Sequence, residues 1–288
     1  MSDYLIRGIG EGFRVLAVDS TEIVNEAVRR HGTLPTASAA FGRALTMGVI
    51  MGSMLKNEEK VTVTIQGGGP IGAIVIDSNA KGHVRGYIGN PHVHFELNDH
   101  GKLDVARAVG TEGHINVTKD IGLKENFIGS TEIISGELAE DFSFYFYSSE
   151  QVPSIVALGV LVNPDNTIKA AGGYIIQVMP DATEERINEL QEMSKSFRPV
   201  SQLIDEGLKP EAIINTLIGE DAWRKLSEMP VSFQCNCSKE RFLDAISSLD
   251  PTEIMKMIQE DGGAEVDCHF CRNKIWIDKT ELGQLIQR

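Results

Sequence analysis

The sequence predicts an α+β protein in three parts: a mixed, largely antiparallel sheet with packed helices, a helical linker, and a small module that contains every cysteine. Three observations predict this. β-Branched runs follow one another across short turns, the chain becomes charged and helical after Pro180, and no cysteine precedes Cys235. Strands that follow strands through short turns favour an antiparallel sheet, and 288 residues suffice for more than one domain. We expect the boundaries 1–180, 181–230 and 231–288.

The N-terminal part begins with a predicted strand and two predicted helices. Residues 12–18 alternate in polarity, as a half-buried strand does. Asp19-Ser-Thr-Glu22 has the pattern that starts a helix, which is expected to reach Arg30 with Gly32 as its stop. A second, apolar helix follows Pro35.

The apolar stretch at 37–55 is the one candidate for a membrane span. Arg43 and several small residues interrupt it, so it falls short of the clean apolar run that a span needs. Gly48-x-x-x-Gly52 suits close helix packing, and we expect a buried core helix. The N-terminal residues have neither the basic start nor the apolar run of a signal peptide. A cytoplasmic protein without a membrane partner is expected.

β-Branched runs predict the sheet. The runs at 61–66 and 71–77 are joined by Gly67-Gly-Gly-Pro70, which predicts a hairpin turn. A phosphate-binding loop is the poorer interpretation, because a helix should follow such a loop and another β-branched run follows instead. Further strands are expected at 83–88, 114–118, 142–147 and 173–178.

The expected linker is strongly charged, with eleven acidic and six basic side chains between residues 181 and 228. Two narrow apolar stripes at helical spacing run through it. They consist of Ile187, Leu190, Met193 and Phe197, and of Ile213, Ile214, Leu217 and Ile218. Such a segment buries little area alone, so it must pack against another part of the chain. Two interpretations stay open, a solvated connector and a functional switch.

The C-terminal module has its own helix starts and strand. Ser238 is expected to cap a helix over 239–249, Asp250-Pro-Thr-Glu253 begins a second helix, and Gly262-Gly263 ends it. Residues 274–278 form a predicted strand. A piece of about 58 residues has a marginal core, so it needs an additional cross-link such as a bound metal ion.

The cysteines form two tight pairs, Cys235-Asn-Cys237 and Cys268-His-Phe-Cys271. Such spacing lets both sulfurs of a pair face the same side, and four soft thiolates suit the closed tetrahedral shell of Zn²⁺. Two close pairs with no other cysteine in the chain make a strong pattern. We predict one Zn²⁺ per chain bound by these four sulfurs. The same closeness would let each pair form a disulfide when the metal leaves.

Three histidines are weaker metal-binding candidates. His269 lies between two predicted ligands, but four sulfurs already fill a tetrahedron. His92 and His94 alternate on a possible strand without a third partner, so a surface or core pair is expected there.

The predicted zinc module has two interpretations, a structural ribbon and a redox switch. Metal binding supplies folding energy, on the order of 10–16 kcal/mol in small zinc modules. The thiolates that it requires are also the form that peroxide or hypochlorite attacks. Oxidation of one pair would remove two ligands at once, unfold the module and expose apolar surface, and the adjoining linker could follow.

Several segments besides the cysteine pairs carry a family resemblance. They are Gly69-Pro-Ile-Gly-Ala-Ile-Val-Ile, Gly82-His-Val-Arg-Gly-Tyr87, Tyr147-Ser-Ser-Glu-Gln-Val-Pro153, Ala171-Gly-Gly-Tyr-Ile-Ile-Gln-Val-Met-Pro180 and Phe233-Gln-Cys-Asn-Cys-Ser-Lys-Glu-Arg-Phe242. With the C-terminal cysteine arrangement, they make essentially the whole chain resemble the 33-kDa heat shock protein family of redox-regulated holdase chaperones.

The resemblance implies a specific redox cycle. In the reduced, inactive protein, Cys235, Cys237, Cys268 and Cys271 would bind Zn²⁺. Under oxidative stress they would form the disulfides Cys235–Cys237 and Cys268–Cys271 and release the metal. The linker would then unfold, and the protein would tend to form a homodimer. It would hold unfolding client proteins without ATP and would not be an enzyme.

Charge and context weigh against rival functions. With 41 acidic and 27 basic residues, the net charge is −14 and the pI is near 5.0. A nucleic-acid-binding zinc ribbon would need clustered Lys and Arg for phosphate contacts. In a thiol–disulfide oxidoreductase the C-x-x-C usually begins a helix beside a βαβ pattern, whereas here it follows Asp267. No nucleophile elbow or His–carboxylate constellation suggests a hydrolase.

Overall fold

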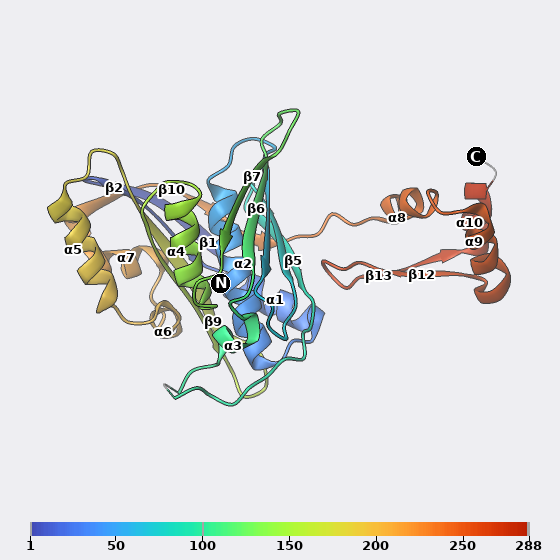
Figure 1. Cartoon of the computed structure of the whole chain (residues 1–288), viewed down its shortest axis with the longest axis horizontal. Coiled ribbons are helices and arrows are strands. Elements are labelled where there is room, and N and C mark those ends of the chain that lie inside the picture. Colours follow the sequence, from blue (N-terminus) through green and yellow to red (C-terminus); the bar gives the residue numbers. More distant parts are fainter. Residues whose placement is uncertain (1, 100, 287–288) are drawn as a thin grey trace. The chain divides into compact units, whose positions relative to one another are not determined.

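The computed structural model describes residues 2–99 and 101–286, and Figure 1 shows the path of the chain. The chain forms two compact units, Met1–Gln234 and Cys235–Arg288. The first unit contains two β-sheets with helices, and the second contains a two-stranded sheet with short helices. The predicted α+β class is confirmed.

Five antiparallel strands form the first sheet, in the order β10-β1-β2-β9-β8. Their bounds are Tyr4–Gly10 for β1, Phe13–Asp19 for β2, Ser154–Val162 for β8, Ile168–Val178 for β9 and Trp223–Pro230 for β10. The strands predicted at 12–18 and 173–178 are confirmed as β2 and part of β9. Strand β10 is an edge strand of this sheet although it belongs to the stretch expected to be a linker.

The second sheet has six strands in the order β11-β5-β4-β3-β6-β7. Their bounds are Lys60–Gln66 for β3, Ile74–Asn79 for β4, His83–Ile88 for β5, His114–Asp120 for β6, Phe127–Glu132 for β7 and Ser232–Phe233 for β11. Only β11 pairs in parallel, with β5. The predicted hairpin is confirmed, because Ile65 of β3 lies opposite Ile74 of β4.

Helix α2 (Pro35–Ser53) is the centre of the first unit, and it packs against strands of both sheets. Nearly all of its side chains are buried, which confirms the predicted core helix. Glycine allows its close approach to β4: a Cβ on Gly48 would lie 2.4 Å from Cγ2 of Ile76. Within the described residues, no helix is long and apolar enough to span a bilayer.

Helix α1 (Thr21–His31) begins and ends where the sequence predicts, but its N-terminus is capped from elsewhere. The Ser20 side chain makes no capping bond. Instead, the buried carboxylate of Asp3 accepts hydrogen bonds from the backbone N–H groups of Glu22 (3.1 Å) and Ile23 (2.7 Å). Gly32 ends the helix in the left-handed conformation, with φ of 61°.

The strand predicted at 142–147 is wrong, because these residues lie in helix α4 (Leu138–Ser148). The aromatic run favours a strand by local propensity. However, Leu138, Phe142 and Tyr145 recur at helical spacing and are all fully buried. Burial of this helical face overrides the local preference. A short helix, α3 (Val105–Val109), precedes β6.

The charged stretch after Pro180 folds onto the first sheet. It forms α5 (Glu184–Lys195), α6 (Val200–Asp205), α7 (Pro210–Ile218) and a 3₁₀ turn at Glu220–Ala222 before β10. Its apolar stripes join Phe13 and Tyr174 of the sheet in a second hydrophobic cluster. Packing against another part of the chain is thus confirmed. In this structure the stretch belongs to the first unit, and its action as a separate linker stays a prediction.

The second unit is small and has a thin core. It contains α8 (Lys239–Ile246), α9 (Pro251–Lys256), a π-helical turn (Met257–Asp261), β12 (Gly263–Asp267), β13 (Lys274–Asp278) and α10 (Lys279–Ile286). Both predicted caps are confirmed: the Ser238 hydroxyl accepts from Arg241 N, and the Asp250 carboxylate accepts from Thr252 N. Among its described residues, four side chains of its hydrophobic cluster are buried: Ile246, Ile254, Ile277 and Leu282.

Candidate metal centre

Two loops of the second unit present the four cysteines. Cys235 and Cys237 lie on the extended segment that precedes α8. Cys268 and Cys271 lie on the tight turn between β12 and β13. The backbone N–H of Arg272 donates to the Cys268 carbonyl at 2.7 Å, and the N–H of Cys268 donates to the Asn273 carbonyl at 3.0 Å. This turn fixes both of its sulfurs on one side of the hairpin.

The four sulfurs converge on one point. Their Sγ atoms all lie within 4.8 Å of one another. Sγ of Cys235 is 3.8 Å from Sγ of Cys268, and Sγ of Cys237 is 3.4 Å from Sγ of Cys271. No disulfide joins any of the four cysteines. Among residues 2–99 and 101–286, no other group of three or more His, Cys, Asp or Glu side chains has metal-binding geometry.

These distances fit a tetrahedral thiolate site. Zn–S bonds of about 2.3 Å at tetrahedral angles place sulfurs about 3.8 Å apart. A disulfide would require about 2.05 Å. The sulfur set therefore has the size and donor chemistry of a four-coordinate site for a soft divalent cation, of which Zn²⁺ is the most common in proteins.

Burial distinguishes the two pairs. Cys268 and Cys271 are 6% and 4% exposed, whereas Cys235 and Cys237 are half-buried. Burial raises the pKa of the Cys237 and Cys271 thiols, because the low-dielectric surroundings penalise the thiolate. Without a cation these thiols keep their protons at neutral pH. Metal binding must therefore displace protons from the site.

The predicted histidine candidates lie outside this cluster. His269 is in the turn between two of the cysteines but is not among the converging groups. His92 and His94 lie in an irregular loop, not in a strand. Nδ1 of His94 is 3.1 Å from Oγ1 of Thr36, which ties this loop to the start of α2.

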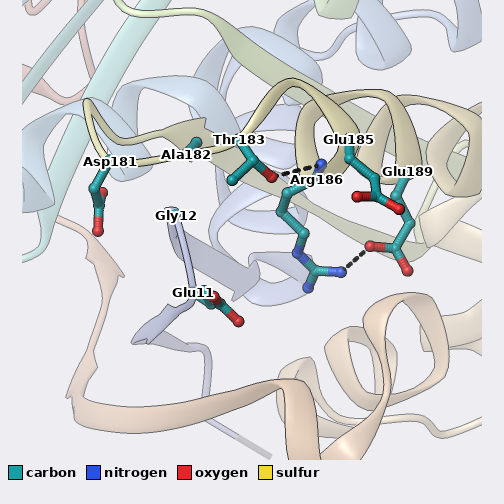
Figure 2. Close-up of a pocket in the computed structure, with 8 residues that line it drawn as sticks. All are labelled: Glu11, Gly12, Asp181, Ala182, Thr183, Glu185, Arg186 and Glu189. Atoms are coloured by element: carbon teal, nitrogen blue, oxygen red, sulfur yellow. Dashed lines mark hydrogen bonds and ion pairs between the residues drawn. The ribbon is translucent and has the colours of Figure 1, made fainter.

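A cavity at the start of α5 was not found by sequence reasoning. It has a volume of about 430 Å³ and is mostly lined by charged side chains (Figure 2). The Arg186 guanidinium carbon lies 5.2 Å from the centre of the Phe13 ring. The guanidinium group also forms an ion pair with Glu189. A charged residue inside a charged helix gives no sequence signal for this contact, which fastens α5 to β2.

Comparison with known proteins decides the family. The family model described as "Hsp33 protein" matches residues 3–278. The chain belongs to the Hsp33 family. This membership confirms the resemblance found in the sequence motifs.

Relatives of the Hsp33 family match the whole chain. Proteins named 33 kDa chaperonin from Geobacillus kaustophilus and Halalkalibacterium halodurans are 56% and 54% identical to it, and each alignment covers 100% of this chain and at least 98% of the relative. A solved structure of the 33 kDa chaperonin (heat shock protein 33 homolog) from Thermotoga maritima has a TM-score of 0.91 and 32% identity, and covers 99% of this chain and 98% of that one. The fold described here is thus an Hsp33-family fold, and the chain belongs to a family of chaperones.

Proposed function

We propose that this chain is an ATP-independent holdase that is switched on by oxidation of its four cysteines. In the reduced state, Cys235, Cys237, Cys268 and Cys271 hold one Zn²⁺ and the chain is inactive. In the oxidised state the cysteines form disulfides, part of the first unit unfolds, and the chain holds unfolding client proteins. The observation that carries this proposal is the convergence of four cysteine sulfurs, not joined by disulfides, in a unit whose described residues include only a small buried apolar cluster.

In this scheme the metal ion cross-links two segments of the second unit. When bound, Zn²⁺ keeps all four sulfurs as thiolates and links the segment before α8 to the β12–β13 turn. The small apolar cluster of the second unit cannot offset much chain entropy by itself. Loss of two ligands in one oxidation therefore removes most of the free energy that keeps this unit folded.

The oxidation is a two-electron reaction for each pair. One thiolate attacks peroxide, so that the O–O bond breaks, a sulfenic acid forms and one oxygen leaves as water. The second thiolate of the pair then attacks the sulfenic sulfur, the S–S bond forms and a second water leaves. Each pair of thiolates gives two electrons to one peroxide, and two protons from the solvent convert the released hydroxides to water, so two equivalents of peroxide oxidise all four cysteines.

We infer the pairing Cys235–Cys237 and Cys268–Cys271, because partners one or two residues apart need no long chain movement. Sulfur contacts in this structure also join Cys235 to Cys268 and Cys237 to Cys271, so pairing between the two loops is the alternative. Proteolysis and mass spectrometry of the oxidised chain distinguish these pairings. Peptides that link 235 to 268 would contradict the local pairing.

Within the proposed linker, residues 181–230, the stretch 181–222 is the part that we expect to respond to the switch. Helix α5 has one fully buried side chain, Leu190, and its first turn is held by Arg186 against Phe13. Elements with few buried contacts unfold first. Unfolding of this stretch would uncover the apolar face of the first sheet, where Tyr174 and Ile176 lie.

The proposed partners follow from this scheme. Clients are unfolded or partly unfolded proteins, and the oxidised chain forms a homodimer through its uncovered apolar surface. The acidic net charge of −14 supports neither a nucleic-acid partner nor an anionic membrane partner. We expect no enzymatic turnover and a cytoplasmic location.

Light scattering of a thermally unfolding client tests the proposal. The chain is added either reduced and zinc-loaded or treated with peroxide, and zinc is measured in each sample. Suppression of aggregation by the oxidised form alone, with release of about one zinc per chain, is expected. If neither form suppresses aggregation, the cysteine cluster has only a structural role.

A further inference from the structure

The segment 223–234, which we call the strap, connects the edges of both sheets of the first unit. Its first part is β10, which pairs along β1 from Tyr4↔Pro230 to Gly10↔Trp223. Its last part is β11, which pairs with β5. The strap ends one residue before Cys235, so the proposed redox centre begins where the strap ends.

The middle of the strap is held mainly by its backbone. Five consecutive side chains of β10, from Arg224 to Glu228, are exposed. At its other end, the N–H groups of Val231, Ser232 and Gln234 donate to the carbonyls of Asp3 (3.2 Å), Gly82 (3.0 Å) and Val84 (2.9 Å), and the buried Val231 side chain packs in the hydrophobic cluster around α2. A backbone hydrogen bond adds little net stability, because the same groups bond to water in the unfolded chain. An edge strand whose middle side chains are exposed is therefore among the elements that open most readily.

Two aromatic side chains anchor the strap. The Trp223 ring covers Gly8 of β1, where a Cβ would lie 2.3 Å from the ring. Trp223 Nε1 also donates to Asn215 Oδ1 of α7 at 2.8 Å. At the opposite end, Phe233 packs against the main hydrophobic cluster with the Arg30 guanidinium carbon 5.6 Å from its ring centre. Removal of the strap would leave an unpaired β1 edge with an aromatic-sized space above Gly8.

We propose that the oxidised chain binds clients by strand addition at the β1 and β5 edges, where an extended apolar client segment takes the place of the strap. The strap itself shows what these edges accept: a main chain in extended conformation, with an aromatic side chain over Gly8. Strand addition derives affinity from main-chain hydrogen bonds and selectivity from pockets for alternate side chains. It suits clients without a common sequence.

This inference rests on the proposed function, because oxidation is what frees the strap. The second unit starts at Cys235, directly after Gln234. When its thiols are oxidised and it unfolds, the last bonds of the strap lose their ordered continuation and fray from that end. In the reduced chain, the strap occupies the site and client segments are excluded.

Peptide competition is the first test. A synthetic peptide of residues 223–234 is added to the oxidised chain during the client aggregation assay. Two control peptides carry either Trp223→Ala or N-methyl groups on alternate backbone amides. The unmodified peptide should inhibit client protection at a concentration at least about tenfold lower than either control. Equal inhibition by all three peptides would overturn strand addition.

Hydrogen exchange gives a second, independent readout on the full chain. The β1 amides that face β10 should exchange slowly in the reduced chain, rapidly in the oxidised chain, and slowly again when client is bound. The amides of β3 and β4, which lie inside the second sheet, are the internal control and should exchange slowly in all three states. Failure of client to restore protection in β1 would contradict the proposal.

A pair of strap variants tests whether the strap keeps the reduced chain inactive. Trp223→Ala removes the ring that covers Gly8, and the reduced variant should suppress client aggregation at a concentration at which the reduced parent does not. Leu226→Ala is the matched control, because Leu226 is 52% exposed on the same strand, and its reduced form should remain inactive. Identical behaviour of the two variants would rule out the strap as the regulated occupant.

Different results would contradict the holdase function and the strand-addition proposal. If the oxidised parent does not suppress aggregation, the holdase function itself is wrong. If it does, while the peptides compete equally and β1 remains unprotected with client, only strand addition is wrong and clients bind another surface.

Discussion

The two cysteine pairs differ in burial and in local structure. Cys235 and Cys237 are half-buried on an extended segment, whereas Cys268 and Cys271 are almost fully buried in a hydrogen-bonded turn. The segment of the first pair lies outside regular secondary structure, and there Arg241 Nη1 donates to the Asn236 carbonyl at 3.1 Å. We therefore expect the placement of the first pair to depend more on a shared ligand than that of the second pair.

Replacement of Cys268 by serine tests the four-sulfur shell. Cys268→Ser leaves three thiolates, and zinc affinity should fall by at least about 100-fold, because even partners outside the shell contribute about 10–100-fold. Competition against a chromogenic chelator measures this. His269→Ala, next to it in the turn but outside the sulfur cluster, is the control and should retain zinc. Unchanged zinc retention in Cys268→Ser would refute the four-cysteine site.

Asp3 gives the first unit a pH-dependent stability. Burial raises the pKa of this carboxyl to about 7, although it accepts two backbone hydrogen bonds at the start of α1. A group whose pKa is higher in the folded state stabilises the fold at low pH, and that contribution disappears as pH rises through the folded pKa.

The free energy of unfolding of the parent should therefore fall relative to Asp3→Asn as pH rises from about 4 to about 7. Urea denaturation of the reduced full chain at several pH values measures the difference between the two proteins. Parallel stability–pH profiles would show that Asp3 titrates normally in the folded state.

At the level of elements, helix α5 is the weakly attached part of the first unit. Leu190 is its one fully buried side chain, and Ile187 is half-buried. The neighbouring cavity, visible in Figure 2, leaves the start of the helix open to solvent around Asp181 and Glu185. Its attachment therefore depends mainly on Leu190, the partly buried Met193 and the Arg186–Phe13 contact.

Leu190→Asn should release α5 and raise client binding by the reduced chain. Removal of a buried leucine side chain costs about 2–5 kcal/mol, which is large for a helix with so few contacts. Gln191→Ala, at the next and exposed position, is the control and should leave the reduced chain inactive. Light scattering with reduced protein provides the readout. An inactive reduced Leu190→Asn protein would show that α5 does not restrain activity.

Sequence patterns predicted the buried elements well and the edge elements poorly. Helix α2, the β3–β4 hairpin and β5 follow directly from apolar periodicity and turn residues. Strand β10 was missed because five of its side chains are exposed and leave no alternation to detect. Helix α4 was assigned as a strand because its aromatic run has high β-propensity, and only tertiary packing shows its helical face.

The convergence of the four cysteines was the most predictable part of the candidate site. Two close cysteine pairs are a local pattern, so this grouping needed no knowledge of the fold, and metal binding by it stays a prediction. The Arg186–Phe13 contact and the cap of α1 by Asp3 join residues far apart in the chain. No local pattern contains them.

At the level of the whole chain, the two units have very different cores. The main cluster of the first unit surrounds α2 and draws on both sheets. The cluster of the second unit has four buried members. Unfolding of the second unit would therefore leave the centre of the first unit intact, as the proposed redox switch requires.

Removal of metal under reducing conditions should separate the two units. With a strong chelator present, amides of α8, β12 and β13 should exchange at nearly unfolded rates, whereas those of α2, β3 and β4 remain protected. Hydrogen exchange with mass spectrometry measures both in one sample, and added zinc should restore the slow exchange. Slow exchange of the second unit after complete metal removal would show that its apolar core suffices without a staple.

Under the proposed strand addition, the strap and the edge that it covers remain parts of one chain, and this would give the chain a way to release a bound client. With α7 folded, only Gly219 and the turn at Glu220–Ala222 separate the helix from β10, and a short tether of this kind produces a local concentration on the order of millimolar. Unfolding of residues 181–222 would lengthen the tether, and the local concentration falls with about the −3/2 power of its length. Client segments would then compete. Refolding after reduction would restore the short tether, so the chain's own strand would displace weakly bound clients by mass action without nucleotide hydrolysis.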